Sequence, residues 1–168
     1  MRAIRPEPLT AAAFAAFGDV VEAEGAFELI NGGTSRRFAD LAKVDVTAKG
    51  GRPQVSIYRA EPFALPLAIA MLERHPLSSQ LFMPIYRKPF LIVVAPRGDG
   101  VHSAAVRAFV TNGRQGVNYR RSTWHHPLIA LESASDFVVI DRAGEGQNCD
   151  EFHFDADALV LQPPEPQG

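Results

Sequence analysis

Two histidine-bearing stretches carry the residue types that move protons or bind metals. One is ERHPLSSQ, residues 73–80; the other is WHHPL, residues 124–128, which holds two of the five histidines beside the only tryptophan. Side chains two apart on a strand share a face, so Glu73 and His75 point the same way, and the next loop returns Gln80 to their neighbourhood. Because imidazole titrates near neutral pH and binds divalent metals, these residue types could serve either purpose.

Structural roles remain open for the same residues. A histidine before a proline is often a turn residue, Glu73 could lie on a solvated strand edge, and Gln80 could satisfy a backbone group. Neighbouring strand positions point to opposite faces, so only one of His125 and His126 should enter a protein interior. Tyr119 is of a type more often found in a core, although its hydroxyl could reach inward.

The elements that must position these residues are short strands. Runs of strand length, rich in Val, Ile and Phe, occur at 55–60, 81–86, 90–96, 106–111, 127–131 and 136–141. Turn residues such as RGDG (97–100) and NG (112–113) separate several of them. Regular spacing of short strands predicts an antiparallel barrel or sandwich.

Helices should be few. Thr10 is placed to cap a short helix that begins after it, with Leu9 and Phe14 in contact across its start and Gly18 ending it. This interpretation is favoured over a signal peptide. We expect a second short helix over residues 156–161 behind Asp155, and a flexible tail at residues 162–168. Residues 60–77 contain three prolines and are expected to be irregular or at a sheet edge.

Length and composition limit the classes of function. The 168 residues correspond to one domain, and 17 Lys and Arg against 19 Asp and Glu leave a net charge of −2, without the basic excess of a nucleic-acid binder. No apolar run is long enough to cross a bilayer. The single Cys149 cannot form an intrachain disulfide, which favours a cytoplasmic location. We therefore expect neither a nucleic-acid nor a membrane partner.

The first stretch resembles the metal-binding motif of the cupin barrels, HxHx4E. Glu73, His75 and Gln80 stand in its three places, so two of the three identities differ. A later cupin strand supplies one more histidine, for which WHHPL offers His125 or His126. The resemblance implies an all-β, cupin-like antiparallel barrel of the jelly-roll type, with one or two short helices.

Longer motifs resemble one family more closely. ELINGGTSRRFADL, ERHPLSSQLFMP, RAFVTNGRQGVNYRRSTWHHPL and DFVVIDRAGEGQNCD occur in the order and at the chain length of the ureidoglycolate lyases of allantoin degradation, once described as ureidoglycolate hydrolases. The resemblance extends from about Phe14 to Cys149. It implies a homodimer that cleaves (S)-ureidoglycolate to glyoxylate and urea.

The resemblance and the reaction together give the candidate site. The family pattern WHxP favours His125 over His126, and we expect the rings of His75 and His125 to converge in one closed β-cavity. Carbon–nitrogen elimination needs a base, an acid and a cation for the carboxylate. The catalytic candidates are His75, His125, Glu73 and Gln80. The substrate-binding candidates are Arg59, Arg120, Tyr119 and His126, with Arg59 preferred among the arginines over Arg120, Arg107 and Arg121.

A metal is not required by these residues. Candidate ligands are His75, Gln80 and His125. Glutamine is a weak neutral ligand and Glu73 stands where a cupin has a histidine, so the set of two histidines, Glu73 and Gln80 is a poor match to a tight transition-metal site. The family resemblance suggests nickel as the divalent metal. We expect turnover to survive chelation, whereas loss of activity restored by nickel would show a metal requirement.

Two other functions remain open at this point. An amidohydrolase acting on the same substrate would release ammonia instead of urea. A non-catalytic cupin that binds a small organic acid could share every residue named here, because a binding site and a catalytic site can be built from the same side chains. Product analysis and turnover distinguish the three.

Overall fold

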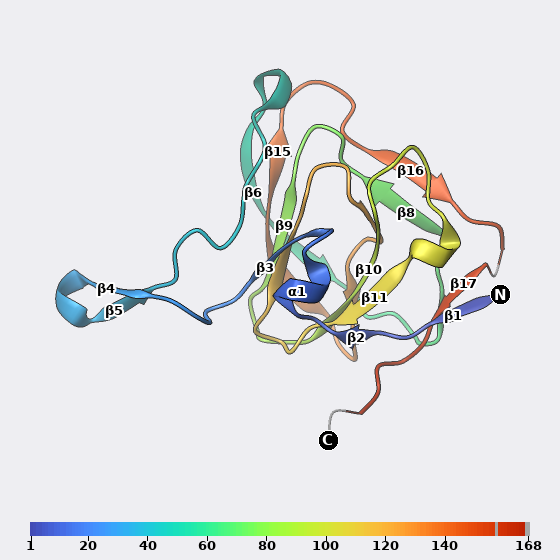
Figure 1. The fold of residues 1–168 in the computed structure, drawn as a ribbon, viewed down its shortest axis with the longest axis horizontal. Helices are drawn as coiled ribbons and strands as arrows, with labels where there is room; N and C mark the ends of the chain where they lie inside the picture. The colour runs from blue at the N-terminus through green and yellow to red at the C-terminus, as the bar shows by residue number, and fades with distance from the viewer. Residues whose placement is uncertain (157, 167–168) are drawn as a thin grey trace.

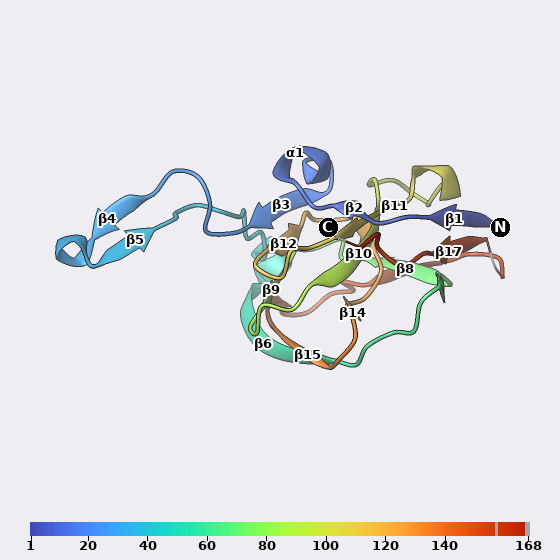
Figure 2. The ribbon, with the colours of Figure 1, turned by 90° about the horizontal axis from the view of Figure 1, so that it is seen from below.

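The computed structural model describes residues 1–156 and 158–166, and almost all regular structure in them is β. Figure 1 shows a barrel-like body with a thin arm that extends from one side, and Figure 2 shows the same arm from below. Within the described part of the chain, no helix is long and apolar enough to span a bilayer. The expected all-β, cupin-like class is confirmed.

Two larger sheets form the body. One has the order β16-β8-β13-β10-β11-β2, with β14 paired to β10; the other has the order β3-β12-β9-β15-β6. The strands of the first are β2 (Glu7–Pro8), β8 (Met71–Arg74), β10 (Phe90–Ala95), β11 (Arg107–Val110), β13 (Trp124–His125), β14 (Ile129–Ala130) and β16 (Asp150–His153). Those of the second are β3 (Gly18–Val21), β6 (Arg52–Ala60), β9 (Gln80–Pro84), β12 (Gly116–Tyr119) and β15 (Ser135–Ala143).

The smaller elements lie around this body. A three-stranded sheet has the order β1-β17-β7, with strands β1 (Arg2–Ile4), β7 (Leu67–Ala68) and β17 (Leu159–Leu161). A separate hairpin pairs β4 (Glu28–Ile30) with β5 (Ser35–Arg37). The helix α1 (Ala11–Phe14) is short, and three 3-10 turns lie at Asn31–Gly33, Ala48–Gly50 and Ser103–Ala105.

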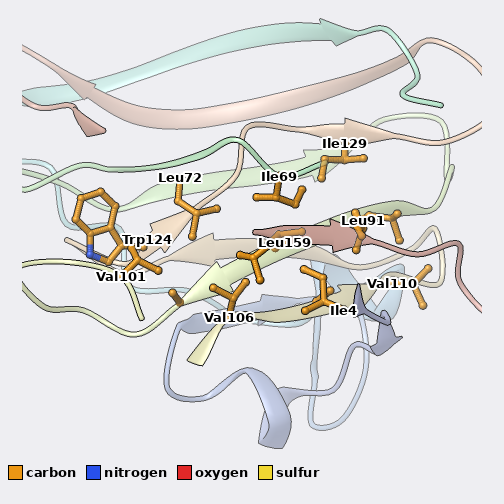
Figure 3. Packing of buried hydrophobic residues seen from close by; sticks show 14 residues of the cluster. Ile4, Ile69, Leu72, Leu91, Val101, Val106, Val110, Trp124, Ile129 and Leu159 are labelled. Carbon is orange, nitrogen blue, oxygen red and sulfur yellow. The ribbon is translucent and has the colours of Figure 1, made fainter. Parts of the chain in front are cut away.

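The core has two layers, one on each side of β10. All six residues of this strand, FLIVVA, are buried, as expected for a strand covered on both faces. Leu91, Val93 and Ala95 pack in one cluster with Trp124 and Leu159, and Figure 3 shows the labelled members of this cluster filling the space between strands. Phe90, Ile92 and Val94 face the five-stranded sheet in the other cluster.

Each of the six expected strand runs contains a strand. Thr10 also caps α1 as expected, because its side chain accepts a hydrogen bond from the amide of Ala13. The second helix, expected over residues 156–161, is wrong: Leu159–Leu161 forms β17, which pairs with β1 and β7, while residue 157 lies outside the described part. Of the expected tail, residues 167–168 also lie outside it.

Residues 60–77 follow the expectation only in part. The segment around Pro62 and Pro66 is largely irregular, but β8 is an interior strand between β16 and β13. The prolines flank β8 and do not interrupt it, so its backbone is free to pair on both sides. This interior position holds Glu73 and presents His75 at the strand end.

Candidate active site

Two histidines and one carboxylate meet between the two larger sheets. Glu73 lies directly opposite His125 across the β8–β13 pair, and His75 follows β8 immediately. The Oε1 atom of Glu73 lies 3.5 Å from Nε2 of His125 and 3.7 Å from Nε2 of His75. The centroids of the two imidazole rings are 5.1 Å apart. Antiparallel pairing thus joins residues that are distant in the chain.

His125 is held rigidly and almost fully buried, with 1% of its surface exposed. Its ring stacks on Tyr119 with centroids 4.2 Å apart and planes 9° apart. The Nδ1 atom lies 3.0 Å from the carbonyl oxygen of Thr123, which can only accept, so we assign the proton to Nδ1. In the described part of the chain, Nε2 of His125 has no hydrogen-bond partner. Its lone pair is therefore directed toward Glu73.

His75 faces an acceptor at each ring nitrogen. Its Nδ1 lies 2.7 Å from the carbonyl oxygen of Asn148, and its Nε2 lies 3.0 Å from Oε1 of Gln80. The Gln80 amide is oriented by Asp141, because Gln80 Nε2 donates to Asp141 Oδ2 over 3.2 Å. Only the doubly protonated imidazolium of His75 can donate to both acceptors, so these two contacts oppose the effect of burial on its charge; a cation could also take the place of the second proton.

Burial and neighbouring charge act against each other at this cluster. Burial alone would raise the pKa of Glu73, but the close contact with His125 and the charges of His125 and His75 outweigh it and lower that pKa. The pKa of His75 is also lowered, mainly by burial and then by the charge of His125. A charged Glu73 beside His75, whose lowered pKa favours release of its proton, is suited to proton transfer.

A cavity of about 430 Å³ opens beside the cluster. Its lining includes Tyr58, Glu73, His75, Gln80, Phe82, Pro127, Leu128, Asp141, Arg142, Asn148 and Cys149. Arg142 is the only Lys or Arg among these residues, and it is buried and donates to the carbonyl oxygens of Ala48 and Glu145. The cavity wall therefore presents two carboxylates, Glu73 and Asp141, and no free guanidinium.

The candidate arginines lie elsewhere. Arg59 is largely exposed and forms a bidentate ion pair with Asp136. Its Nε donates to Oδ1 over 2.8 Å, and its Nη2 donates to Oδ2 over 2.9 Å. Arg120 lines a different cavity, with Asp19 and Asp45. Alternation explains the placement of Arg59, because Tyr58 is its neighbour on β6 and lines the cavity. The structure does not bring either arginine to the His75–His125 cluster.

Tyr119 and His126, the other two substrate-binding candidates, do not line the cavity either. Tyr119 lies beneath the ring of His125, and burial raises the pKa of its hydroxyl well above the usual range. His126 packs edge-on against Phe63 and hydrogen bonds through Nδ1 with the carbonyl oxygen of Pro127 at 2.9 Å. Of the adjacent pair, His125 is the one that points inward.

Three cavity residues that contact Glu73, His75 or Gln80 were not among the sequence candidates. Asp141 orients Gln80, Asn148 orients His75 through its backbone oxygen, and the Cys149 thiol donates to Glu73 Oε2 over 3.8 Å. Burial, with the charge of Glu73, raises the pKa of that thiol and disfavours a nucleophilic thiolate. All three residues lie inside the quoted motif DFVVIDRAGEGQNCD, which was the signal that could have identified them.

The cluster is also suited to a divalent cation. The ligand atoms of Glu73, His75 and His125 all lie within 4.8 Å of one another. Each histidine directs Nδ1 at a backbone carbonyl, an arrangement that orients metal-binding imidazoles and turns Nε2 toward Glu73. The lone pair of His125 Nε2 also lacks a hydrogen-bond donor in the described part. Of the residues considered as ligands, Glu73, His75 and His125 thus lie together, with Gln80 Oε1 beside His75.

Comparison with known proteins gives a consistent result. A family model described as ureidoglycolate lyase matches residues 1–161. The ureidoglycolate lyase of Pseudomonas syringae pathovar tomato is 52% identical over 168 residues, 99% of each chain. That of Burkholderia mallei is 55% identical over 152 residues, 90% of this chain and 89% of the relative. That of Pseudomonas fluorescens is 52% identical over 165 residues, 97% of this chain and 99% of the relative.

Proposed function

This chain belongs to the ureidoglycolate lyase family, and from that premise we propose that it cleaves (S)-ureidoglycolate to glyoxylate and urea at the Glu73–His75–His125 cluster. The observation that carries the proposal is the convergence of two imidazoles and a carboxylate beside a cavity of about 430 Å³. That volume is ample for a substrate built on a two-carbon acid.

The reaction is an elimination in which the two products together contain all the atoms of the substrate. The reacting carbon of ureidoglycolate bears a hydroxyl group, a carboxylate and a urea nitrogen. Loss of the hydroxyl proton turns the C–O bond into the carbonyl of glyoxylate, and the C–N electron pair leaves with the urea nitrogen, which takes up a proton. The enzyme must therefore accept one proton and donate another.

His125 is suited to accept the hydroxyl proton by way of Glu73, because Glu73 lines the cavity and His125 does not. Its Nδ1 is committed to the carbonyl of Thr123, and its Nε2 has no other partner in the described residues. When Nε2 takes the proton, the resulting imidazolium lies 3.5 Å from the carboxylate of Glu73. This negative charge stabilises the imidazolium as it forms.

His75 is suited to protonate the departing nitrogen. Its protonated ring is held by the acceptors of Asn148 and Gln80, while burial and the charge of His125 lower its pKa and favour proton release. Glu73 lies between the two Nε2 atoms, at 3.5 and 3.7 Å. It can return the proton from His125 to His75 after each turnover.

A divalent cation, with nickel as the first candidate, would be held by Glu73, His75 and His125, with Gln80 beside them. This donor set of imidazole and carboxylate is suited to nickel, zinc or manganese. When bound, such an ion supplies Lewis acidity that lowers the pKa of a substrate hydroxyl.

Metal binding can be measured independently of catalysis. The metal-stripped protein should take up one nickel ion per chain, measured by calorimetry and elemental analysis. His125→Ala should weaken this affinity by about tenfold or more, because one ligand is lost, whereas His153→Ala at an exposed position should not. Equal uptake by both variants would contradict a metal site at this cluster.

The cellular setting follows from the same premise. We place the reaction in the nitrogen catabolism of purines, through allantoin, and the protein in the cytoplasm. The free Cys149 is consistent with that compartment. We further propose that the active species is a homodimer.

Product analysis tests the activity. The protein incubated with ureidoglycolate should form glyoxylate and urea in equal amounts and no ammonia. Ammonia without urea would indicate cleavage of the amide, and binding without turnover would indicate a carrier of small acids. Either result would reject the lyase.

A further inference from the structure

A protruding arm, residues 23–42, is the least explained part of the molecule. It contains the β4–β5 hairpin and extends away from the body in both views (Figures 1 and 2). In the described residues, every hydrogen bond of residues 23–42 stays within that segment. An isolated two-stranded hairpin is only marginally stable in water, so the arm should pack against another surface.

The arm carries an unpaired cation near its tip. Arg37 pairs with Glu28 across the hairpin, whereas Arg36 forms no ion pair or side-chain hydrogen bond among the described residues. Its guanidinium instead lies over the ring of Phe27, 4.9 Å from the centroid. Phe27 and Leu29 are 47% and 61% exposed, so the arm presents apolar surface beside this cation.

Among the described residues, the active-site cavity lacks a free cation, and Arg36 of the arm is one. A carboxylate substrate needs a cation, and guanidinium binds a carboxylate with two parallel hydrogen bonds. The only arginine in the described cavity wall, Arg142, is engaged with backbone carbonyls, while Glu73 and Asp141 repel an anion. The cavity is thus complementary in charge to a free arginine delivered from outside.

An exposed apolar sheet face lies next to the cavity. Strand register aligns Val55 with Ile140, and Ile57 with Val138 and Met83, on the outer face of the five-stranded sheet. Val55 and Ile57 are 70% and 57% exposed. On the same edge strand, β6, Tyr58 points the other way and lines the cavity. A chain segment crossing this edge can therefore contact both the sheet face and the cavity mouth.

One chain thus carries both the arm and a face to receive it, which is the requirement for a closed two-fold assembly. The nine steps between the ten residues from Val21 to Ile30 can span roughly 30 Å when extended, enough to cross a sheet edge. We propose that, in a dimer, the arm of each protomer crosses β6 of its partner and places Arg36 at the partner's cavity, where it binds the substrate carboxylate. This substrate role rests on the proposed function; the placement of the arm does not.

Cross-linking tests the placement without any reference to turnover. Cys149 is the only cysteine of the chain and lies at the cavity, 3.8 Å from Glu73. Arg36→Cys should form a disulfide between position 36 of one chain and Cys149 of the other under mild oxidation with diamide, giving a covalent dimer. Mass spectrometry of mixed isotope-labelled protein identifies the linked peptides as belonging to two chains.

Two controls define the result. Arg36→Cys combined with Cys149→Ser should lose the 36–149 link, and Arg5→Cys, at an exposed position on another part of the surface, should not form a link to Cys149. A 36–149 link within one chain, no such link, or a monomeric protein would each overturn the proposal.

Mixed dimers test the contribution of Arg36 to catalysis. Arg36→Ala should lower kcat/KM by about ten- to a hundredfold, mainly through KM, as expected for a lost charged hydrogen bond. Arg36→Lys should restore part of the loss, and Arg5→Ala should have no effect.

Equal amounts of Arg36→Ala and His125→Ala protein, exchanged to mixed dimers, should recover about a quarter of the wild-type activity. Half of the dimers are then mixed, and each has one complete site if the arm acts on the partner. No recovery despite exchange would overturn the proposal. A wild-type protein without turnover would instead reject the proposed function and leave the cross-linking result to decide the placement.

Discussion

At the scale of single residues, the site depends on how each imidazole is held. The backbone acceptor of Thr123 and the ring of Tyr119 fix His125 in position and tautomer, and the acceptors of Asn148 and Gln80 fix the orientation of the His75 ring. Glu73, with its lowered pKa, supplies the negative charge between them. Orientation of the histidines, more than their presence, therefore distinguishes this cluster from a buried structural pair.

Removing the inward-pointing imidazole should abolish most of the activity. His125→Ala is expected to lower kcat by at least about a hundredfold, the lower end for a lost general acid or base. Circular dichroism should show an intact fold. The control, His153→Ala, changes an exposed histidine on β16 and should retain the wild-type rate. Near-normal turnover of the His125 variant would remove this residue from the mechanism.

The lowered pKa of His75 makes the free energy of unfolding depend on pH. The unfolded chain binds a proton below its ordinary pKa of 6.5, while the folded chain binds it only at lower pH. This contribution to stability is therefore complete above pH 6.5 and is lost as the pH falls through the folded pKa. Glu73, whose pKa is lowered from 4.5, adds a similar loss at more acidic pH.

Urea unfolding between pH 5 and pH 7.5 measures the effect. The wild-type unfolding free energy should fall with decreasing pH, and one titrating group can contribute at most about 1.4 kcal/mol per pH unit. His75→Gln should reduce this slope, whereas the exposed-site change His153→Gln should not. The same slope in both variants would show that His75 is not the responsible group.

At the scale of elements, four strands from the two sheets converge on the site. Strands β8 and β13 bring Glu73 opposite His125, and β9 and β15 place Gln80 beside Asp141. Because the side chain of Asp141 can only accept when ionised, it fixes the direction of the Gln80 amide. Asp141 is thus a positioning residue that acts on His75 through Gln80.

Asp141→Asn should leave the direction of the Gln80 amide less well fixed, since an asparagine can present either an acceptor or a donor to Gln80. We expect kcat to fall about tenfold, with a shift in the pH at half-maximal rate, because the Gln80 oxygen no longer stabilises the His75 imidazolium. Asp141→Glu should preserve more activity. A changed rate with an unchanged pH profile would indicate a structural role alone.

Much of the fold could be predicted from local pattern. The run FLIVVA at 90–95 is apolar at every position and became the strand buried on both faces, and Thr10 capped its helix because capping is a local interaction. Residues 159–161 became a strand because pairing with β1 and β7 determines their conformation. No local signal contains that long-range pairing.

The residue types of the site could be predicted from the sequence, but the partners of its charged and polar side chains could not. Alternation indicated that one of two adjacent histidines points inward, and resemblance selected His125. The pairing of Arg59 with Asp136 depends on the β6–β15 register, which the sequence alone did not determine. The supports of Gln80 and His75 likewise come from residues that are distant in the chain, Asp141 and Asn148.

At the scale of the whole molecule, the apolar face of the five-stranded sheet and the arm beside it favour a dimer. Val55 and Ile57 expose their side chains on β6, an edge strand, and such exposed apolar strands are prone to association unless they are covered. Two-fold symmetry would bring each face against a second copy. The proposed arm contact would then make catalysis depend on assembly.

Ile57→Asp should therefore dissociate the dimer and reduce activity together. Two-fold symmetry introduces the charge twice into an apolar contact, so the dimer dissociation constant should rise by about a hundredfold or more, measured by sedimentation. The specific activity should fall as the protein is diluted through that constant. Ala104→Asp adds the same charge at an exposed 3-10 turn away from the arm and should change neither property (Figure 1). A fully active monomer of the Ile57 variant would show that each site is complete in one chain, because no second copy would then be present to supply Arg36.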